Sequence, residues 1–185
     1  MKNFFIADLH LGHERIIPMC NRPFKDGIDM TNKIIEKWNK KVTDKDTVYI
    51  LGDLSFKMKK EEIIEILKQL KGKKILIKGN HDTFVGQRDF DECFEGIYDM
   101  FQLRENQLQI TLCHYPIIDF PGMYYGAIMI YGHVHNKYVP HKNMYCVSVE
   151  CINYEPVTFD ELTEIYKNKT IEEKVDWTLK WEENN

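Results

Sequence analysis

Short apolar runs rich in β-branched and aromatic residues recur along the chain, and each has about the length of a β-strand. They lie at residues 4–7, 47–51, 74–77, 109–113, 127–131 and 144–149. Between the first runs, apolar residues recur with helical spacing, at Ile34, Ile35, Trp38 and Val42 and again at Ile63, Ile64, Leu67 and Leu70. A last helical pattern follows Phe159, with Ile171, Val175 and Leu179 on one side and Trp177 and Trp181 displaced around it.

The order of these elements predicts the fold class. The first half alternates strand and helix, whereas the second half is rich in strands, which indicates an α/β core with a second layer built mainly of strands. The 185 residues contain no internal repeat, low-complexity segment or Gly/Ser linker. We therefore expect a single domain spanning residues 1–185.

Composition narrows the class of protein. Hydrophobic residues make up 43% and charged residues 29%, as in ordinary soluble globular proteins. The net charge of −4 gives no basic nucleic-acid footprint, and we interpret the local lysine clusters as helix-end charges. The five cysteines form no C-x-x-C pair, and no apolar run is long enough for a signal peptide or a membrane span. These features favour a cytoplasmic protein without a disulfide framework.

Polar side chains that can bind metal ions follow five successive predicted strands, always at the same end. They are Asp8 and His10, then Asp53, Asn80 and His81, His114, and finally His133 and His135. Any one of them has an ordinary explanation, as a turn residue, a cap or a structural histidine. Because ligand crevices of open α/β sheets form at this end of the strands, the joint pattern predicts a metal site.

The same residues resemble a known signature. Asp8-x-His10, Gly52-Asp53, Gly79-Asn80-His81-Asp82, His114 and Gly132-His133-x-His135 are similar, in this order, to the motifs of the calcineurin-like metallophosphoesterase superfamily. The spacing resembles that of small bacterial and phage-type members, and the matched span runs from Phe4 to His135. The resemblance implies a two-sheet β-sandwich flanked by helices, in α/β/β/α order, with a two-metal site at the strand ends.

The resemblance also distributes the ligands. It implies that Asp8, His10 and His135 hold the first metal, that Asn80, His114 and His133 hold the second, and that Asp53 bridges both. A bridging carboxylate can hold two cations about 3.5–4 Å apart, and their surplus positive charge suits a hydroxide and a phosphoryl group. The nitrogen and oxygen ligands permit Mn, Fe, Zn, Co or Ni. We expect a hydrolase of phosphomonoesters or phosphodiesters that uses a two-metal-activated hydroxide.

His81 has a different implied role. The resemblance makes it the group that donates a proton to the leaving oxygen or stabilises the phosphoryl charge, and histidine can adopt either protonation state near neutrality. Many relatives carry an orienting carboxylate three residues after the Gly-Asp aspartate, but here that residue is Phe56. Either Asp82 or a main-chain group orients His81, or the ring is less well preorganised.

Substrate contacts are predicted by weaker signals. His13 and Arg22 follow the first ligand pair, and a guanidinium group holds phosphate well. Tyr124 and Tyr125 offer rings for stacking a nucleobase, although packing within a loop is the simpler interpretation. Cys113 adjoins His114, but a neighbouring residue in a strand points to the opposite face.

Two other functions compete with the phosphatase or phosphodiesterase hypothesis. One is a nuclease, which the acidic net charge disfavours. The other is a phosphoesterase-like scaffold for protein binding, as in the similarly sized retromer subunit. Such a scaffold does not need the leaving-group histidine, so His81 favours an enzyme. We expect a phosphorylated small molecule or nucleotide as substrate, and neither a membrane nor a nucleic acid as partner.

Overall fold

Parallel pairing of three early strands builds the first sheet in the computed structural model, which describes residues 1–137 and 143–167. A short parallel strand extends one edge of this sheet, and a two-residue antiparallel strand extends the other. The order is β4-β3-β2-β1-β9. The bounds are β1 (Asn3–Ile6), β2 (Thr47–Ile50), β3 (Lys73–Ile77), β4 (Gly96–Tyr98) and β9 (Val157–Thr158).

The second sheet has four strands in the order β5-β6-β7-β8. They are β5 (Met100–Glu105), β6 (Leu108–Cys113), β7 (Ile128–Tyr131) and β8 (Met144–Cys146). The first two form an antiparallel hairpin whose turn residues, Asn106 and Gln107, both have positive φ, the requirement of a tight type I′ turn. The remaining pairs are parallel, so β6, β7 and β8 end at the same edge.

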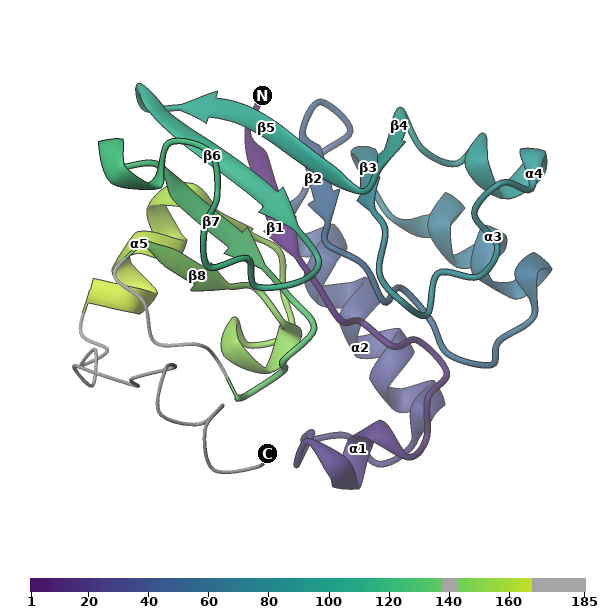
Figure 1. Cartoon of the computed structure of the whole chain (residues 1–185). Helices are drawn as coiled ribbons and strands as arrows, with labels where there is room; N and C mark the ends of the chain where they lie inside the picture. Colours follow the sequence, from purple (N-terminus) through teal and green to yellow (C-terminus); the bar gives the residue numbers. More distant parts are fainter. Residues whose placement is uncertain (138–142, 168–185) are drawn as a thin grey trace, which may run out of the picture.

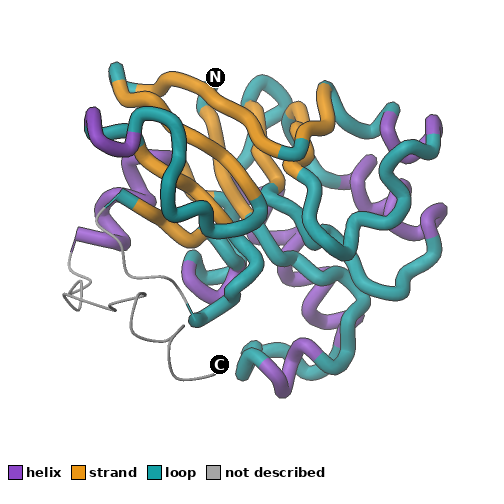
Figure 2. The backbone as a smooth tube through the Cα atoms, in the orientation of Figure 1, coloured by secondary structure: helices purple, strands orange, loops and turns teal. Residues whose placement is uncertain are grey.

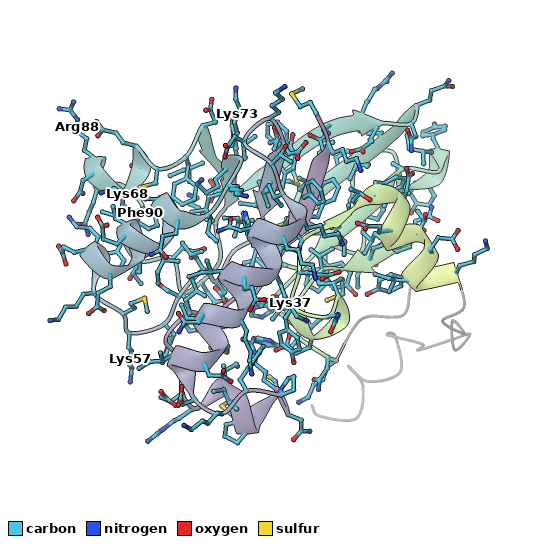
Figure 3. The ribbon with its side chains drawn as sticks, turned by 180° about the vertical axis from the view of Figure 1, so that it is seen from behind. Lys37, Lys57, Lys68, Lys73, Arg88 and Phe90 are labelled. Carbon is cyan, nitrogen blue, oxygen red and sulfur yellow. The ribbon has the colours of Figure 1, made fainter. Side chains whose placement is uncertain are left out.

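Helices cover the outer face of the first sheet, and the second sheet packs on its other face (Figures 1 and 3). The longest helix buries Met30, Ile34 and Trp38. Of the predicted stripe, Ile34, Trp38 and Val42 are buried and Ile35 is partly buried. It begins where the Asp26 carboxylate accepts a hydrogen bond from the Asp29 amide, 2.8 Å away. The helices are α1 (Ile16–Met19), α2 (Gly27–Lys41), α3 (Lys60–Gln69), α4 (Arg88–Asp91) and α5 (Phe159–Lys167), with 3-10 turns η1 (Met123–Tyr125) and η2 (Val149–Cys151).

Alternation along the strands of the second sheet separates two apolar clusters. Ile128 and Ile130 of β7 join the large core that includes β1, β2 and β3. Met129 and Tyr131 instead belong to a smaller cluster on the other face, with Cys113 and Cys146. Two mixed sheets with flanking helices are the α/β architecture that the sequence predicts.

The six apolar runs all form strands, although several boundaries differ by one to three residues. Strand β8 ends at Cys146 rather than at residue 149 because the chain turns into η2. The short strands β4 and β9 and the polar strand β5 have no clear apolar run and were not predicted. Of the last predicted helix, the structure describes only the part that forms α5. The rest of its predicted apolar positions lie outside the described residues: Ile171, Val175, Trp177, Leu179 and Trp181.

The ends of the two sheets are joined directly. The Ala7 amide, just after β1, donates to the Val147 carbonyl over 2.8 Å, and the Val149 amide donates back to the Ala7 carbonyl over 3.1 Å. Figure 2 shows the loops that leave the strands of both sheets gathering at this end. No helix within the described residues is long and apolar enough to cross a membrane. The predicted ligands therefore lie where the two layers meet.

The indole of Trp38 provides a test of the packing beneath the first sheet. It is fully buried, and its Nε1 donates to the Lys71 carbonyl over 2.9 Å. We expect Trp38→Phe to lower the free energy of unfolding by about 2–3 kcal/mol, because it shrinks a packed side chain and removes this donor. Denaturant unfolding measures the change. Tyr125→Phe, at a ring that is 95% exposed, is the control, and equal effects of the two substitutions would contradict the packing described.

Candidate metal centre

The backbone turns sharply wherever it presents a predicted ligand. Five of these residues adopt left-handed backbone angles, a conformation that is uncommon outside glycine and that costs conformational energy. Their φ values are 57° for Asp8, 48° for His10, 53° for Asp53, 69° for His133 and 52° for His135. The paired ligands therefore reach one site through consecutive bends rather than along an extended strand. Strain of this kind, repeated at one place, is typical of a functional site.

Asp8, His10 and His135 form the first group of potential ligands. One atom from each side chain lies within 4.8 Å of the others. Asp8 and His10 are buried, and Asp8 Oδ1 and both ring nitrogens of His10 have no hydrogen-bond partner. Unpartnered buried polar atoms are costly, so these atoms fit a bound cation that would satisfy them.

A second group comprises Asp53, His114, His133 and the neighbouring Asn80. His114 Nδ1 lies 2.8 Å from the Leu51 carbonyl, which can only accept a hydrogen bond, so this nitrogen bears the proton. In the neutral ring, His114 Nε2 is then an unprotonated atom, yet it lies 3.2 Å from Asn80 Oδ1. It is also 3.2 Å from His133 Nδ1. His114 Nε2 and Asn80 Oδ1 are then two acceptor atoms that face each other, and a cation bound between them would satisfy both.

The Asp53 carboxylate lies between the two groups. Its Oδ2 is 3.4 Å from His10 Nε2, and its Oδ1 is 3.6 Å from His114 Nε2. Asp53 is itself buried, with 2% of its surface exposed. Each carboxylate oxygen thus faces a different group of ligands.

Burial sets the charge of the first group. It raises the pKa of Asp8 to about 6, although the nearby His135 and His114 and the Ser148 hydroxyl oppose the shift. Burial, with neighbouring cationic groups such as His135 and Arg22, lowers the pKa of His10 to about 2. His10 is therefore neutral near physiological pH, the form that binds metal, and a bound cation would favour the carboxylate form of Asp8.

The Gly79-Asn80-His81-Asp82 corner is fixed by its last residue. The Asp82 carboxylate accepts hydrogen bonds from the amides of Asp53 at 3.0 Å, Leu54 at 3.0 Å and Gly79 at 2.7 Å. It therefore ties the loop after β3 to the loop after β2. Gly79 is required at this contact, because an added Cβ would lie 2.5 Å from the Asp53 amide nitrogen.

His81 lies beside the bridging carboxylate. Its amide donates to Asp53 Oδ1 over 2.9 Å, and its Nε2 is 3.9 Å from Asp53 Oδ2. The ring meets the Phe56 ring edge-on, with centroids 4.9 Å apart and planes at 86°. Phe56 also contacts His13, with centroids 4.1 Å apart. A phenyl ring thus contacts His81 at the position where the resemblance leads one to expect a carboxylate.

Comparison with known proteins identifies the family of this chain. The model of the calcineurin-like phosphoesterase family matches residues 1–183. The chain belongs to the calcineurin-like phosphoesterase family. The family is metal-dependent, in agreement with the His and Asp groups described above, and its description as phosphoesterase suggests action on phosphate esters.

Individual proteins are similar to this chain over most or part of its length. An uncharacterized protein of Methanocaldococcus jannaschii is 36% identical over 180 residues, which cover 92% of this chain and 94% of that protein. The gene 66 protein of Mycobacterium phage L5 is 37% identical over 82 residues, 43% of this chain and 39% of that protein. The crystal structure of a protein of unknown function from Aquifex aeolicus matches with a TM-score of 0.70 and 27% identity, covering 89% of this chain and 98% of that one.

The predicted substrate residues differ in their placement. His13 lies in the site, where its ring is 5.5 Å from that of His10 and its Nδ1 is buried without a hydrogen-bond partner. Tyr124 and Tyr125 are exposed in η1, at 83% and 95%. Cys113 lies in the outer apolar cluster, on the other face of the sheet from the large core.

Arg22 lies beside the first group of potential ligands. Its side chain is fully buried, and its Nη1 and Nη2 donate to the carbonyls of Leu9 at 2.9 Å and Asp8 at 2.8 Å. Its Nε and Nη2 also contact Glu150 Oε1, at 2.9 Å and 2.7 Å. With these contacts the guanidinium group is bonded to main-chain carbonyls and to a buried carboxylate.

Two residues of the site were not found from the sequence. Ser148 Oγ donates to Asp8 Oδ2 over 2.6 Å, and Glu150 Oε1 lies 3.1 Å from His135 Nδ1. Both follow β8 in the segment Val-Ser-Val-Glu-Cys, which contains no ligand motif. Their proximity depends on the junction of that segment with the end of β1.

Removing the Asp82 carboxylate tests how the site is assembled. We expect Asp82→Ala to lower the free energy of unfolding by about 3–5 kcal/mol, because three buried amides lose a charged acceptor. Bound metal, measured by elemental analysis, should fall as well, because Asp53 and Asn80 lie on the two tethered loops. The matched control is Asp99→Ala, whose exposed carboxylate pairs only with Lys78 among the ion pairs described. An Asp82 variant as stable and as metal-rich as this control would contradict the tether.

Proposed function

We propose that this chain hydrolyses phosphomonoester or phosphodiester bonds with two divalent ions. The first ion is assigned to Asp8, His10 and His135, the second to Asn80, His114 and His133, and Asp53 is assigned to both. The observation that supports this most directly is the Asp53 carboxylate, whose two oxygens face different ligand groups at 3.4 Å and 3.6 Å.

The charges of the ligands suit phosphate chemistry. Asp8 and Asp53 are the two carboxylates among the seven proposed ligands, so two divalent ions would leave a surplus of positive charge. When bound, such ions activate water as a nucleophile and stabilise the charge on phosphoryl oxygens. Mn, Fe, Zn, Co and Ni are all compatible with the nitrogen and oxygen donors, and Mn²⁺ is the first ion to test.

His81 is the proposed donor of a proton to the leaving oxygen. Its amide is fixed to Asp53 Oδ1, so the ring is carried by the same carboxylate that is assigned to both ions. Its side chain is 36% exposed, unlike the buried Asp53 beside it. A substrate entering from solvent can therefore meet the imidazole and the ligand cluster at the same time.

Phe56 and His13 are proposed to limit the movement of the His81 ring. The edge-on contact between Phe56 and His81 is a favourable aromatic geometry. His13 packs against Phe56 and so supports the ring that contacts His81. His13 is also retained as a candidate for substrate contact. In this proposal, aromatic packing provides the preorganisation for which relatives use a carboxylate.

The net charge favours a small substrate over a nucleic acid. The net charge of the chain is −4, which gives no basic nucleic-acid footprint. A phosphorylated small molecule or nucleotide is therefore the proposed substrate class.

Turnover by the His81 variant tests the proposed chemistry. Purified protein supplemented with Mn²⁺ should hydrolyse an aryl phosphate or aryl phosphodiester, and a panel of nucleotide esters should define the preferred class. We expect His81→Ala to lower turnover by about 10²–10⁴-fold, since proton donation is lost. Elemental analysis should still find close to two ions for each chain. Unchanged turnover with a full complement of metal would remove His81 from the mechanism.

The role of Phe56 can be separated from that of the metal ions by the choice of leaving group. We expect Phe56→Ala to slow hydrolysis of alkyl esters, whose leaving oxygen needs a proton, more than that of nitrophenyl esters. The metal content should stay unchanged. In a His81→Ala background the Phe56 substitution should add little, because the ring that it positions is absent. Equal losses for both kinds of ester, or additive losses in the double variant, would show that Phe56 does not act through His81.

A further inference from the structure

The buried Glu150 side chain has no role in the chemistry proposed above, yet it contacts a proposed ligand. It lies in η2, after β8, and its side chain is only 4% exposed. Glu150 Oε1 is 3.1 Å from His135 Nδ1. Because a carboxylate accepts hydrogen bonds, His135 Nδ1 is the donor, and Nε2 is left as the ring nitrogen that can bind a metal ion.

Arg22 contacts the same carboxylate oxygen as His135 does. Its Nε and Nη2 lie 2.9 Å and 2.7 Å from Glu150 Oε1, and the guanidinium group also donates to the main-chain carbonyls of Asp8 and Leu9 and to Met30 Sδ. The guanidinium thus joins the exit of β1 to Glu150, and Glu150 joins that unit to His135. Segments more than a hundred residues apart in sequence are linked by this one pair.

Ionisation of Glu150 agrees with this arrangement. Burial alone would raise its pKa, but the hydrogen bond with His135 and the charge of Arg22 outweigh burial and lower the pKa below its ordinary value. A buried ion pair is a weak source of stability, because desolvation offsets much of the attraction. The Arg22–Glu150 pair is more readily explained as a means of positioning His135.

The main chain of His135 is held by the same region. The Sγ atoms of Cys151 and Cys146 lie 3.3 Å and 3.6 Å from the His135 carbonyl, and both thiols donate to it. His135 has a φ of 52°, a strained conformation that persists only where its surroundings fix it. Side chain and carbonyl are therefore both fixed by residues at or after the end of β8.

We infer that Glu150, anchored by Arg22, is a positioning residue that fixes the ring tautomer and orientation of His135 and so completes the first metal site. The inference rests on the metal-binding part of the proposed function and not on hydrolysis of any ester. It assigns Glu150 and Arg22 to the first ion alone, since the second group is held by the Leu51 carbonyl and the Asp82 tether.

Metal titration without substrate tests the assignment. Metal-free protein is titrated with Mn²⁺ by calorimetry, as wild type, Glu150→Gln and Glu150→Ala. We expect Glu150→Ala to weaken one of two sites by about 10–100-fold and to leave the other unchanged. Glu150→Gln should lie between, because its amide oxygen still accepts a hydrogen bond. The control is Glu155→Gln, which removes a carboxylate paired with Lys41 over 3.2 Å and should retain wild-type binding.

A second measurement needs no metal. Long-range ¹H–¹⁵N NMR at pH 8 reports which ring nitrogen of His135 bears the proton, with the signal assigned from a His135→Asn variant. Wild type should show a single Nδ1–H form, and Glu150→Ala a mixture of both tautomers.

The two measurements distinguish the possible failures. Unchanged tautomer and unchanged Mn²⁺ binding in both Glu150 variants would overturn the inference. So would equal weakening of both sites together with a lower unfolding midpoint, since Glu150 would then support the fold rather than His135. If wild type binds no Mn²⁺, the proposed metal centre fails, while the tautomer measurement still decides whether Glu150 orients the ring. If metal binds as expected without esterase activity, only the proposed reaction fails.

Discussion

The arrangement of the site depends on burying polar atoms that have no protein partner of their own. Asp8 Oδ1 and both nitrogens of His10 lie inside the junction of the two sheets, where each would normally find a hydrogen bond. A protein can maintain such atoms only if a ligand satisfies them or if the surrounding structure is rigid enough to hold them. Here the surroundings are two sheets whose ends are joined through Ala7 to Val147 and Val149. The proposed metal centre therefore depends on the contacts that join the two sheets.

At two glycines the backbone approaches the proposed ligands so closely that no side chain would fit. Gly52 has a φ of 82°, and a Cβ at that residue would lie 2.5 Å from His114 Nδ1. A Cβ on Gly132 would lie 2.7 Å from Asp8 Oδ2, the oxygen that accepts from the His133 amide. Glycine precedes a proposed ligand in both cases because a side chain there would collide with His114 or with Asp8. The Gly-Asp and Gly-His pairs in the sequence are thus packing requirements of the site as well as family motifs.

Much of the fold was predictable because apolar periodicity reports burial directly. The runs at residues 47–51 and 127–131 became β2 and β7, and the stripe through Ile34 and Trp38 became the buried face of α2. The five ligand blocks could be recognised as a set because strand ends converge. Glu150, Ser148 and the buried position of Arg22 could not be predicted, because their contacts join segments that are distant in sequence and follow no spacing rule. Strand β5 gave no clear signal either, because its residues alternate between exposed and only partly buried and form no apolar run.

The two ligand groups are stabilised by different kinds of contact, and this difference has consequences. His114 is oriented by a main-chain carbonyl of Leu51, a group that no substitution at that residue removes. His135 is oriented by a side chain, Glu150, which is held in turn by a second side chain, Arg22. Main-chain orientation is preserved as long as the sheet is intact, whereas the side-chain pair is lost when either residue is substituted. If Glu150 orients His135 as inferred, the first group is the one whose metal affinity depends on side chains outside the ligand set.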